Sequence, residues 1–428
     1  MISKTEDTLV YDSKDDFLRT VKHKFSSYIH SGKNDFINDF VDEYRRVMEM
    51  CLNELWDKVY ECETKKLKYK FHLRRRYFPN GIPKYLHTTS FNCLKNYKGI
   101  LSGRMRSNVV NQLCWILRGE LTSSKKLKHK FQRPNLKYIN PEIPLKHYEI
   151  ILNENSDSIF NEYIKLINFT NRKNQNIIVP IKKHKMDIHY SNLGTLMHSV
   201  CLTKNSIDYR YKMIGEKTTN TNVLGGDMGL NKMCALSDGQ LTPTINSQNI
   251  SYENIVKKIK RKTFNSKNYK KAVKEMKYFT QEVVNKLNIE NIGTLRLESN
   301  KGIKESTKNA NKYWQTEVIK DKIKRKCQNS RVDLVLTLSP YKSQRCSVCG
   351  FVHKNNRVGE KFVCLMCSYV DDADVNSGRN NSLKLPYNDL WSICQFNKTC
   401  GFFWTVDGVT VNSAKIGSLT SPNINKKA

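Results

Sequence analysis

The first third of the chain is dominated by apolar residues at helical spacing. Apolar side chains recur every three or four positions from Phe40 to Val59, and the pattern returns in Ser107–Gly119, which ends on a glycine. This recurrence places the apolar side chains on one face of a helix, and glycine commonly ends a helix. The sequence therefore predicts two amphipathic helices, the second ending at Gly119, within a mostly helical region.

Short apolar runs bounded by turn residues follow between about residues 146 and 222. They are HYEIIL, NIIVPI, TLMHSVCL and IDYRYKMI, and a polar stretch, Gly215–Thr221, closes the series. Runs of this length and composition are typical of β-strands. We therefore expect a small β-barrel or sheet here, ending in a polar linker.

Three later apolar runs each end at a carboxylate. In TNVLGGDMGLNKMCALSDGQ, from Thr221 to Gln240, Asp227 has small neighbours and lies between two strand-like runs. The run IGTLRLESN ends at Glu298, and SYVDDADVNSGRNNSL carries three aspartates where a strand leads into a helix. An acidic side chain at the end of an apolar strand costs free energy unless it is solvated, paired or bound to a cation.

These carboxylates also have ordinary explanations. Asp227 could serve in a turn, although Asp238 in the SDG tripeptide is the residue with the usual turn chemistry. Any of Asp371, Asp372 and Asp374 could cap the helix that follows. Spaced over an α/β core, however, Asp, Glu and Asp supply hard oxygen ligands for two Mg²⁺ ions, which can activate water at a phosphodiester. Composition alone does not select one aspartate of the three.

The charge of the chain points to a polyanionic partner. Its 428 residues include 73 lysines and arginines against 40 carboxylates, a formal net charge of +33. Charge of this size is best explained by nucleic acid. An anionic membrane is less favoured, because the basic residues are spread along the whole chain. A hydrophobic content of 39% argues against wholesale disorder.

Cations alternate with aromatic residues in two segments, Lys65–Phe78 and Lys125–Arg133. Cations can contact phosphates while aromatic faces stack on bases, whereas the plainer alternative is a solvated charged face. A charged helical stretch over residues 251–289 could follow a phosphate backbone in the same way. The candidate nucleic-acid contacts are Lys65, Lys66, Lys68, Lys70, Arg74, Arg75, Arg76, Lys125, Lys126, Lys128 and Lys130.

Four of the 13 cysteines have the spacing of a metal site. Cys346 and Cys349 form one C-x2-C pair, Cys364 and Cys367 form another, and fourteen residues separate the pairs. Each pair presents two sulfurs from one tight turn, which predicts a tetrahedral structural zinc with no open position for chemistry. His353, between the pairs, could replace a ligand but is more simply explained as a solvated loop histidine.

The remaining cysteines and the chain start favour an intracellular protein. The other nine cysteines are scattered, which suits a reducing compartment. No basic segment leads into an apolar run at the start of the sequence. No apolar stretch approaches the roughly 18 residues that a membrane span needs.

Taken in order, these motifs resemble the TnpB proteins of bacterial insertion sequences and their relatives, the miniature type V-F CRISPR effectors. The resemblance covers about residues 221–383. Its motifs are GGDMGLNKMCALSDG, SKNYKKAVKEMKYFTQEVVNKL, LRLES, YWQTEVIKDKIKRKCQNSRVDLVLTLSPYKSQRCSVCG and FVCLMCSYVDDADVNSGRNN. The N-terminal half is similar only in its layout.

The resemblance implies a catalytic set. The family's triad falls on Asp227, Glu298 and Asp374, which would hold two Mg²⁺ ions. The third follows from a DxDxN pattern in which Asp372 is a partner and Asp371 a bystander. Arg379 would help to position the scissile phosphate, and the four cysteines would hold one structural Zn²⁺.

The resemblance also implies a fold. We expect an α/β, RNase H-like RuvC nuclease with an inserted four-cysteine zinc ribbon, preceded by a helical recognition lobe and a β-barrel-like wedge domain. The expected boundaries are an N-terminal part of the wedge domain at 1–35, the recognition domain at 36–134, the wedge domain at 135–220, RuvC parts I and II at 221–338, the zinc ribbon at 339–370, RuvC part III at 371–395 and a C-terminal tail at 396–428.

The implied function is RNA-guided, Mg²⁺-dependent cleavage of DNA paired to a guide RNA beside a short flanking motif. The partners would be a guide RNA and double-stranded target DNA, with no membrane, and the protein would act as a monomer or homodimer in the cytoplasm of a bacterial or phage-infected host. Two alternatives stay open: a non-cleaving RNA-guided DNA-binding repressor and a guide-independent, structure-selective RuvC-type nuclease. The sequence does not separate a transposon protein from a CRISPR effector.

Overall fold

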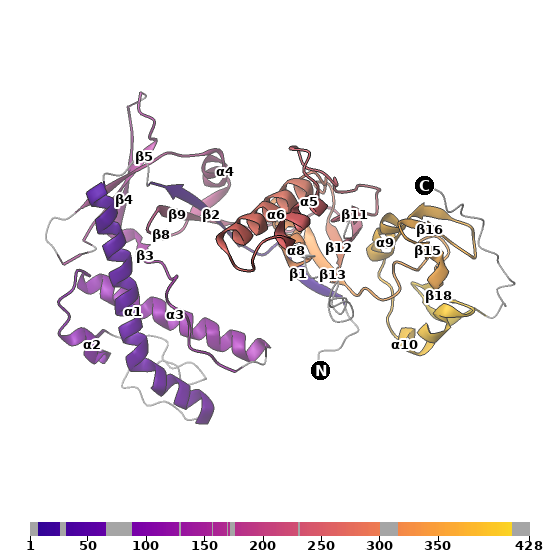
Figure 1. Ribbon diagram of the computed structural model, residues 1–428, viewed down its shortest axis with the longest axis horizontal. Coiled ribbons are helices and arrows are strands. Elements are labelled where there is room, and N and C mark those ends of the chain that lie inside the picture. The colour runs from indigo at the N-terminus through magenta and orange to yellow at the C-terminus, as the bar shows by residue number, and fades with distance from the viewer. Residues whose placement is uncertain are drawn as a thin grey trace. The chain divides into compact units, whose positions relative to one another are not determined.

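The computed structural model contains two compact units, which are described separately (Figure 1). Residues 16–213 form one unit, called here the N-terminal unit, and residues 1–15 and 214–428 form the other, called the C-terminal unit. The structure describes residues 7–25, 31–65, 88–127, 130–155, 157–168, 170–171, 176–229, 232–299 and 316–412. For residues 31, 57–65, 90 and 125–127 only the backbone is described.

The N-terminal unit contains the two expected amphipathic helices. The first, α1, spans Ser31–Lys65 and the second, α3, spans Gly103–Leu127, with short turns η1 (Thr88–Ser90) and α2 (Asn92–Lys95) between them. The prediction that the second helix ends at Gly119 is wrong. Gly119 lies within α3, where a side chain at its position would meet open space, and the helix continues because Leu121 and Ser124 are buried beyond it.

Two antiparallel sheets complete the N-terminal unit. The first has the order β2-β9-β8-β3, and β7 also pairs with β9; the second has the order β4-β5-β6. Within the described residues these sheets take the place of a single closed barrel. The elements are β2 (Phe17–Lys24), β3 (Glu142–Pro144), η2 (Leu145–His147), β4 (Tyr148–Leu152), β5 (Glu162–Leu166), β6 (Ile177–Ile181), α4 (Lys185–Leu193), β7 (Gly194–Leu196), β8 (Ser199–Leu202) and β9 (Ser206–Met213).

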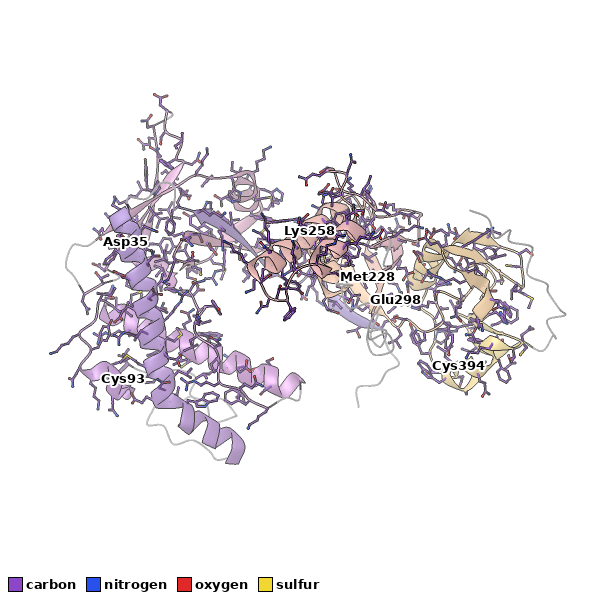
Figure 2. All side chains as sticks on the ribbon, in the orientation of Figure 1. Asp35, Cys93, Met228, Lys258, Glu298 and Cys394 are labelled. Carbon is purple, nitrogen blue, oxygen red and sulfur yellow. The ribbon has the colours of Figure 1, made fainter. Side chains whose placement is uncertain are left out.

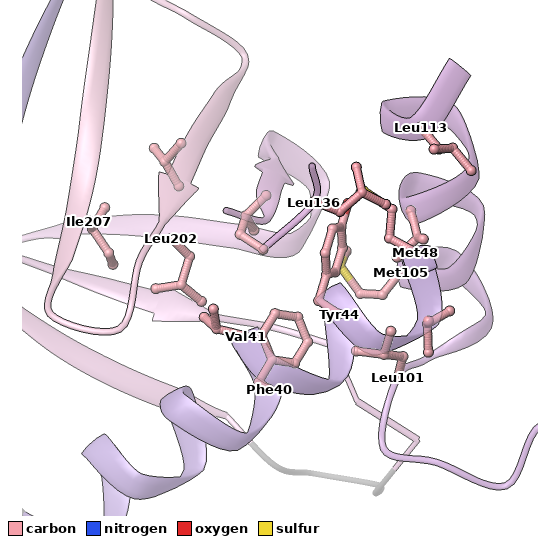
Figure 3. Close-up of a cluster of buried hydrophobic side chains, with 14 of the residues drawn as sticks. Phe40, Val41, Tyr44, Met48, Leu101, Met105, Leu113, Leu136, Leu202 and Ile207 are labelled. Carbon is pink, nitrogen blue, oxygen red and sulfur yellow. The ribbon is translucent and has the colours of Figure 1, made fainter. Parts of the chain in front are cut away.

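One buried cluster joins the helices and sheets of the N-terminal unit. Phe40, Val41 and Tyr44 of α1 belong to the same cluster as Leu202 of β8 and Ile207 of β9 (Figure 3). Because apolar burial supplies most of the folding free energy, a shared cluster stabilises helices and strands together. The expected helical and β-rich domains therefore have a common core.

The C-terminal unit is built on a mixed five-stranded sheet in the order β1-β13-β12-β10-β11. The three central strands, β10 (Val223–Asp227), β12 (Thr294–Glu298) and β13 (Asp333–Thr337), are parallel, and the edge strands β1 (Thr8–Tyr11) and β11 (Ala235–Leu236) are antiparallel to their neighbours. Residues 1–35 were expected to belong to the wedge domain. The structure instead pairs β1 with β13, so the segment divides near Asp15.

Helices lie beside this sheet. Figure 1 shows α5 (Tyr252–Lys260), α6 (Lys267–Asn285) and α8 (Thr316–Ser330) grouped together, with α9 (Ala373–Ser382) apart from them. Serines cap the first two helices: Ser251 Oγ accepts from the backbone N–H of Asn254, and Ser266 Oγ accepts from that of Tyr269. Among the described helices none is long and apolar enough to cross a membrane.

Two small sheets follow the large one. One has the order β15-β16-β17 and the other β14-β18-β19. Their elements are β14 (Phe351–Val352), η3 (Lys354–Asn356), β15 (Arg357–Val358), β16 (Lys361–Val363), β17 (Val370–Asp372), α10 (Leu390–Ile393), η4 (Cys394–Lys398), β18 (Phe402–Thr405) and β19 (Gly408–Val411). The sequence analysis placed β18 and β19 in a C-terminal tail, but they form an ordered hairpin that pairs with β14.

Candidate active site and four-cysteine cluster

Asp227 and Glu298 lie at the same edge of the large sheet. Each is the last residue of its strand, and β10 and β12 run parallel, with Gly226 opposite Leu297. Parallel strands bring their carboxyl ends to one edge, so both carboxylates reach the same place. Both are buried, with 5% and 9% of their surface exposed. Figure 2 labels Glu298 at this edge together with Met228, which follows Asp227.

Asp374 reaches the same edge from α9. This helix packs against β10 at a close approach of two glycines: a Cβ atom on Gly225 would lie 1.9 Å from the carbonyl oxygen of Gly378. Any larger residue at Gly225 would therefore push the helix away. Asp372 begins α9 by accepting the backbone N–H groups of Asp374 and Val375. Asp374, in the first turn, is 8% exposed.

The electrostatics of these carboxylates depend on one another. Burial, and then the neighbouring Glu298, hold the pKa of Asp227 well above its usual range. Burial and then Asp227 raise the pKa of Asp374. Like charges brought together in a buried site disfavour joint ionisation unless a cation is present. The three residues that sequence and resemblance singled out therefore lie together, in a place that favours positive charge.

Arg357 supplies one positive charge, and the sequence analysis missed it. Its Nη2 donates to Asp374 Oδ1 at 2.8 Å, and its Nε donates to the carbonyl oxygen of Gly359 at 3.1 Å. The guanidinium opposes the rise in pKa of both Asp227 and Asp374. Arg357 lies in β15, between the cysteine pairs. No local pattern marks it, because only the folding of that hairpin onto α9 brings it to the site.

Arg379, expected near the scissile phosphate, has other partners. Its Nη1 donates to Asp371 Oδ2 at 2.6 Å and also contacts the Tyr369 hydroxyl, and its Nε donates to the Ser237 carbonyl oxygen at 3.3 Å. Asp371 is therefore the ion-pair partner of Arg379. Asp372, besides capping α9, pairs with Lys232 at 2.6 Å. Asp374 is the one aspartate of the three that is paired with Arg357.

Three buried asparagines fix α9 in place. Asn376 Nδ2 and Asn380 Nδ2 both donate to the carbonyl oxygen of Arg345, at 2.8 and 2.6 Å. Asn381 Nδ2 donates to the Gly226 carbonyl oxygen at 3.0 Å, and its Oδ1 accepts from Thr337. These bonds tie the helix to the start of the cysteine segment on one side and to β10 and β13 on the other. They explain why the helix is rich in asparagine.

The four cysteine sulfurs converge as their spacing predicts. Cys346, Cys349, Cys364 and Cys367 place all four Sγ atoms within 4.8 Å of one another. Cys346 Sγ lies 3.7 Å from Cys367 Sγ, and Cys349 Sγ lies 3.6 Å from Cys364 Sγ. A tetrahedral zinc with bonds of about 2.3 Å requires sulfurs roughly 3.8 Å apart. Among the described residues this is the only group of three or more Cys, His, Asp or Glu ligand atoms so close together.

His353 is not a solvated loop histidine, and that expectation is wrong. Only 5% of it is exposed. Its Nδ1 accepts from the backbone N–H of Asn355 at 3.1 Å, and its Nε2 lies 3.3 Å from the carbonyl oxygen of Thr399. Burial lowers its pKa. The residue joins the loop between the cysteine pairs to η4.

The cysteine cluster is continuous with the carboxylate site. Strand β17 follows Cys367 closely and leads directly into α9, which carries Asp374. Its partner β16 belongs to the hairpin that carries Arg357. The small sheet β15-β16-β17 therefore connects the cysteine cluster to both members of the Arg357–Asp374 pair: Arg357 lies in β15, and Asp374 lies in the helix that follows β17.

The candidate nucleic-acid contacts fall mostly outside the described side chains. Lys66, Lys68, Lys70, Arg74, Arg75, Arg76 and Lys128 lie outside the described residues. Lys65, Lys125 and Lys126 lie at the ends of α1 and α3, with only their backbone described, and Lys130 is exposed.

With this geometry established, residues 318–381 match the family model described as the Cas12f1-like TNB domain. The stretch runs from α8 to α9 and includes all four cysteines, Arg357 and Asp374. These residues are therefore similar to the Cas12f1-like TNB domain. The resemblance to the miniature type V-F effectors is confirmed over this part of the chain.

Two curated relatives carry the same family name. A CRISPR-associated endodeoxyribonuclease Cas12f1 of Sulfoacidibacillus thermotolerans is 32% identical over 92 residues, which are 21% of this chain and 22% of the relative. A second Cas12f1, of Syntrophomonas palmitatica, is 34% identical over 79 residues, or 18% of this chain and 16% of the relative. The matched segments thus span about a fifth of the curated relatives.

Solved structures of such effectors are also similar. A Cas12f1–sgRNA–target DNA complex aligns over 86% of this chain and 99% of the other, with 12% identity and a TM-score of 0.47. The mini-RNA-guided endonuclease CRISPR-Cas_phi3 aligns over 86% of this chain and 93% of the other, with 10% identity and a TM-score of 0.46.

Proposed function

We propose that the chain is an RNA-guided, Mg²⁺-dependent DNA endonuclease with an RNase H-like RuvC active site. The observation that supports this most strongly is the meeting of three buried carboxylates, Asp227, Glu298 and Asp374, at one edge of the parallel strands. The last of them belongs to the Cas12f1-like TNB domain, and the curated relatives of this region are named endodeoxyribonucleases.

The carboxylate site fits divalent cations. Its donors are carboxylate oxygens, which Mg²⁺ prefers, and burial and then the neighbouring carboxylates raise the pKa of Asp227 and Asp374. Asp227, Glu298 and Asp374 would hold two Mg²⁺ ions, which when bound supply an activated water and stabilise the leaving oxygen of a phosphodiester. The ends of β10 and β12 and the first turn of α9 bring the three side chains to one edge of the sheet.

Arg357 is assigned a positioning role beside the carboxylates. About 30% of its side chain is exposed while it contacts Asp374, so part of it is accessible to a bound phosphate. A planar guanidinium can bind two phosphate oxygens at once. We assign Arg357 to hold the scissile phosphate, a role that the resemblance had suggested for Arg379.

The four cysteines are assigned to one structural zinc. Their sulfur separations suit tetrahedral coordination, and four protein ligands leave no position for substrate. The zinc would hold together the β15–β16 hairpin, which carries Arg357, and strand β17, which leads into the helix that carries Asp374. The domain assignment follows: RuvC parts at 221–338 and 371–395, a zinc ribbon at 339–370, and the β18–β19 hairpin added to that ribbon.

The proposed partners are a guide RNA and double-stranded target DNA beside a short flanking motif, bound by a monomer or homodimer. The net charge of +33 favours a polyanionic partner, and the curated relatives are named CRISPR-associated endodeoxyribonucleases. The two basic segments, Lys65–Arg76 and Lys125–Arg133, stay candidates for these contacts.

The test begins with the RNA that copurifies with the chain. That RNA is sequenced, and a plasmid is built that carries the matching target beside a randomised flank. With Mg²⁺ the wild-type protein should linearise plasmids with certain flanks, and the Asp227→Ala protein should leave all of them intact.

Two results would contradict the proposal. If the wild-type protein binds the matched plasmid but leaves it uncut with Mg²⁺, the chain is a repressor. If it cuts matched and unmatched plasmids equally, it is a guide-independent nuclease.

A further inference from the structure

A rigid turn joins α5 and α6 in the C-terminal unit. This turn, residues 261–266, is called here the α5–α6 tip. The backbone N–H of Ser266 donates to the carbonyl oxygen of Thr263 at 3.1 Å, and Asn265 has a φ of 64°. Asparagine tolerates this left-handed conformation better than most residues. Because Ser266 also caps α6, the turn has a defined shape and presents Phe264 at its apex.

Phe264 is the most exposed large hydrophobic side chain among the described residues. Its exposed fraction is 80%, and its nearest ring neighbour is Tyr269, with ring centroids 5.2 Å apart and planes inclined by 60°. Covering the face of an exposed phenylalanine removes apolar surface from water and so lowers the free energy. The rest of the turn is polar or charged, so the tip offers one aromatic face and no wider apolar patch.

The surroundings of Phe264 are strongly positive. Residues 257–277 include ten lysines and arginines and a single carboxylate, Glu275, which pairs with Lys258 at 2.6 Å (Figure 2 labels Lys258). Exposed cations Lys267, Lys271 and Lys274 follow one another along one face of α6 at helical spacing. This row continues to Tyr278, which is 63% exposed, with Lys274 Nζ 5.4 Å from its ring centre.

We propose that the α5–α6 tip is a base-stacking element, in which Phe264 stacks on a nucleobase while the lysine row on α6 contacts the phosphates beside it. A row of cations matches a polyanionic backbone, and a lone aromatic ring matches the π-face that every base offers. An anionic membrane would need several inserted apolar side chains, and the tip has one. The proposal rests on the proposed function for the kind of partner, nucleic acid, but not for cleavage.

The test measures binding without cleavage. The Asp227→Ala chain, freed of copurifying nucleic acid by high salt, is titrated in Mg²⁺-free buffer with three labelled probes of one mixed sequence: single-stranded RNA, an RNA–DNA duplex and a DNA duplex. Phe264→Ala, Phe264→Leu and Phe264→Trp are compared in this background. Thr263→Ala is the matched control, because it alters the same turn without removing a ring. Thermal unfolding checks that every variant is folded.

Stacking of a base on an aromatic side chain is worth about 1–3 kcal/mol, so Phe264→Ala should weaken at least one probe about 5- to 150-fold. The Trp variant should bind like the parent and the Leu variant like the Ala variant. The slope of log affinity against log salt should stay unchanged for Phe264→Ala and fall for Lys267→Ala combined with Lys271→Ala. The weakened probe identifies the nucleic acid that reaches the tip.

Two outcomes would overturn the proposal. Equal affinity of the Ala variant and its parent for all three probes would show that Phe264 does not contact the nucleic acid. Full binding by the Leu variant would show apolar packing in place of stacking. Neither outcome depends on whether the wild-type chain cuts DNA, so failure of this proposal is distinguishable from failure of the nuclease assignment.

Discussion

At the scale of single residues, aspartates that lie close together in the sequence have different contacts in the structure. Asp374 contacts Arg357 and lies near Asp227, while Asp372 caps α9 and pairs with Lys232. We expect Asp374→Asn to abolish plasmid cleavage, because it removes a carboxylate of the triad. Asp372→Asn should keep cleavage within about tenfold, since asparagine is itself a good cap. Wild-type cleavage by Asp374→Asn together with an inactive Asp372→Asn would show that the assignment of the third carboxylate is wrong.

Two arginines compete for the phosphate-positioning role. Arg357 contacts Asp374, whereas Arg379 is held by Asp371 and Tyr369. Arg357→Ala should slow single-turnover cleavage about 100-fold, as loss of one donor to the reacting group commonly does, while target binding persists. Arg357→Lys should retain part of the rate, because the charge remains but the planar fork is lost. A larger loss of rate for Arg379→Ala than for Arg357→Ala would reverse the two roles.

Lys342 is a buried lysine, and the free energy that its burial costs the folded chain depends on pH. Only 1% of it is exposed, and among the described residues its Nζ has no hydrogen-bond partner. Burial lowers the pKa of Lys342 to about 7. The unfolded chain, with a lysine pKa of about 10.4, therefore binds more protons than the folded one between pH 7 and 10. The stability of the folded chain should rise with pH across this window.

The check is the midpoint of thermal unfolding for wild type and Lys342→Met from pH 7 to 9. The methionine variant should be more stable at pH 7, by an amount on the order of a few kcal/mol, and its advantage should shrink as pH rises. A constant difference between the two proteins over this range would mean that Lys342 does not titrate there.

The three carboxylates were predictable from sequence and resemblance, whereas Arg357, the cation that pairs with Asp374, was not. Asp227 and Glu298 end apolar strands, so local pattern marks them. Choosing Asp374 needed the resemblance, because all three aspartates could cap α9. Arg357 has no local signal, since its role depends on the contact of β15 with α9. The burial of His353 likewise depends on η4, which lies more than forty residues away.

At the scale of elements, the β18–β19 hairpin completes the cysteine domain. It pairs with β14, which follows the first two cysteines, and Trp404 donates from Nε1 to the Pro386 carbonyl oxygen at 2.7 Å. The backbone N–H of Trp404 also donates to the Gly350 carbonyl oxygen, in the turn after Cys349. The two-residue loop of this hairpin, Val406–Asp407, lies between β-prone runs but is not an Asn-Gly or Asp-Gly pair, so the sequence signal for the hairpin is weak.

Trp404 should therefore support the cysteine cluster. It is fully buried, so Trp404→Ala should destabilise its domain by about 3–5 kcal/mol and reduce the zinc that copurifies. Trp391→Ala is the matched control, because Trp391 is 51% exposed and its loss should have little effect. Zinc content by metal analysis and the thermal midpoint measure both. Unchanged zinc and stability in Trp404→Ala would show that the hairpin is dispensable to the cluster.

At the scale of the whole molecule, the N-terminal unit is an insertion between β1 and the rest of the C-terminal unit. The chain begins with β1, forms the unit of residues 16–213, and then returns. Thr8 lies opposite Leu336, and the backbone N–H of Ser13 donates to Asp333 Oδ1 at 2.7 Å. Local pattern identifies strands but not distant partners, which is why residues 1–35 were assigned as one piece.

Removal of residues 1–11 should therefore affect one unit alone. Without β1, strand β13 becomes an unpaired edge, and its amide hydrogens should exchange faster with solvent. The amides of β9, which pairs with β2 inside the inserted unit, should keep their protection. Hydrogen exchange with mass spectrometry measures both in one experiment. Equal acceleration in β9 and β13 would contradict the insertion.

The position of β1 also has a consequence for synthesis on the ribosome. The first strand of the large sheet emerges long before its partner β13, and at about 5–20 residues per second the delay is roughly 15–65 seconds. During that interval the inserted unit can fold, while the large sheet lacks a neighbour for its first strand. A prematurely terminated chain that stops before β13 therefore lacks Asp374 and has no complete carboxylate site. Assembly of the candidate site therefore waits until α9, which carries Asp374, has been translated.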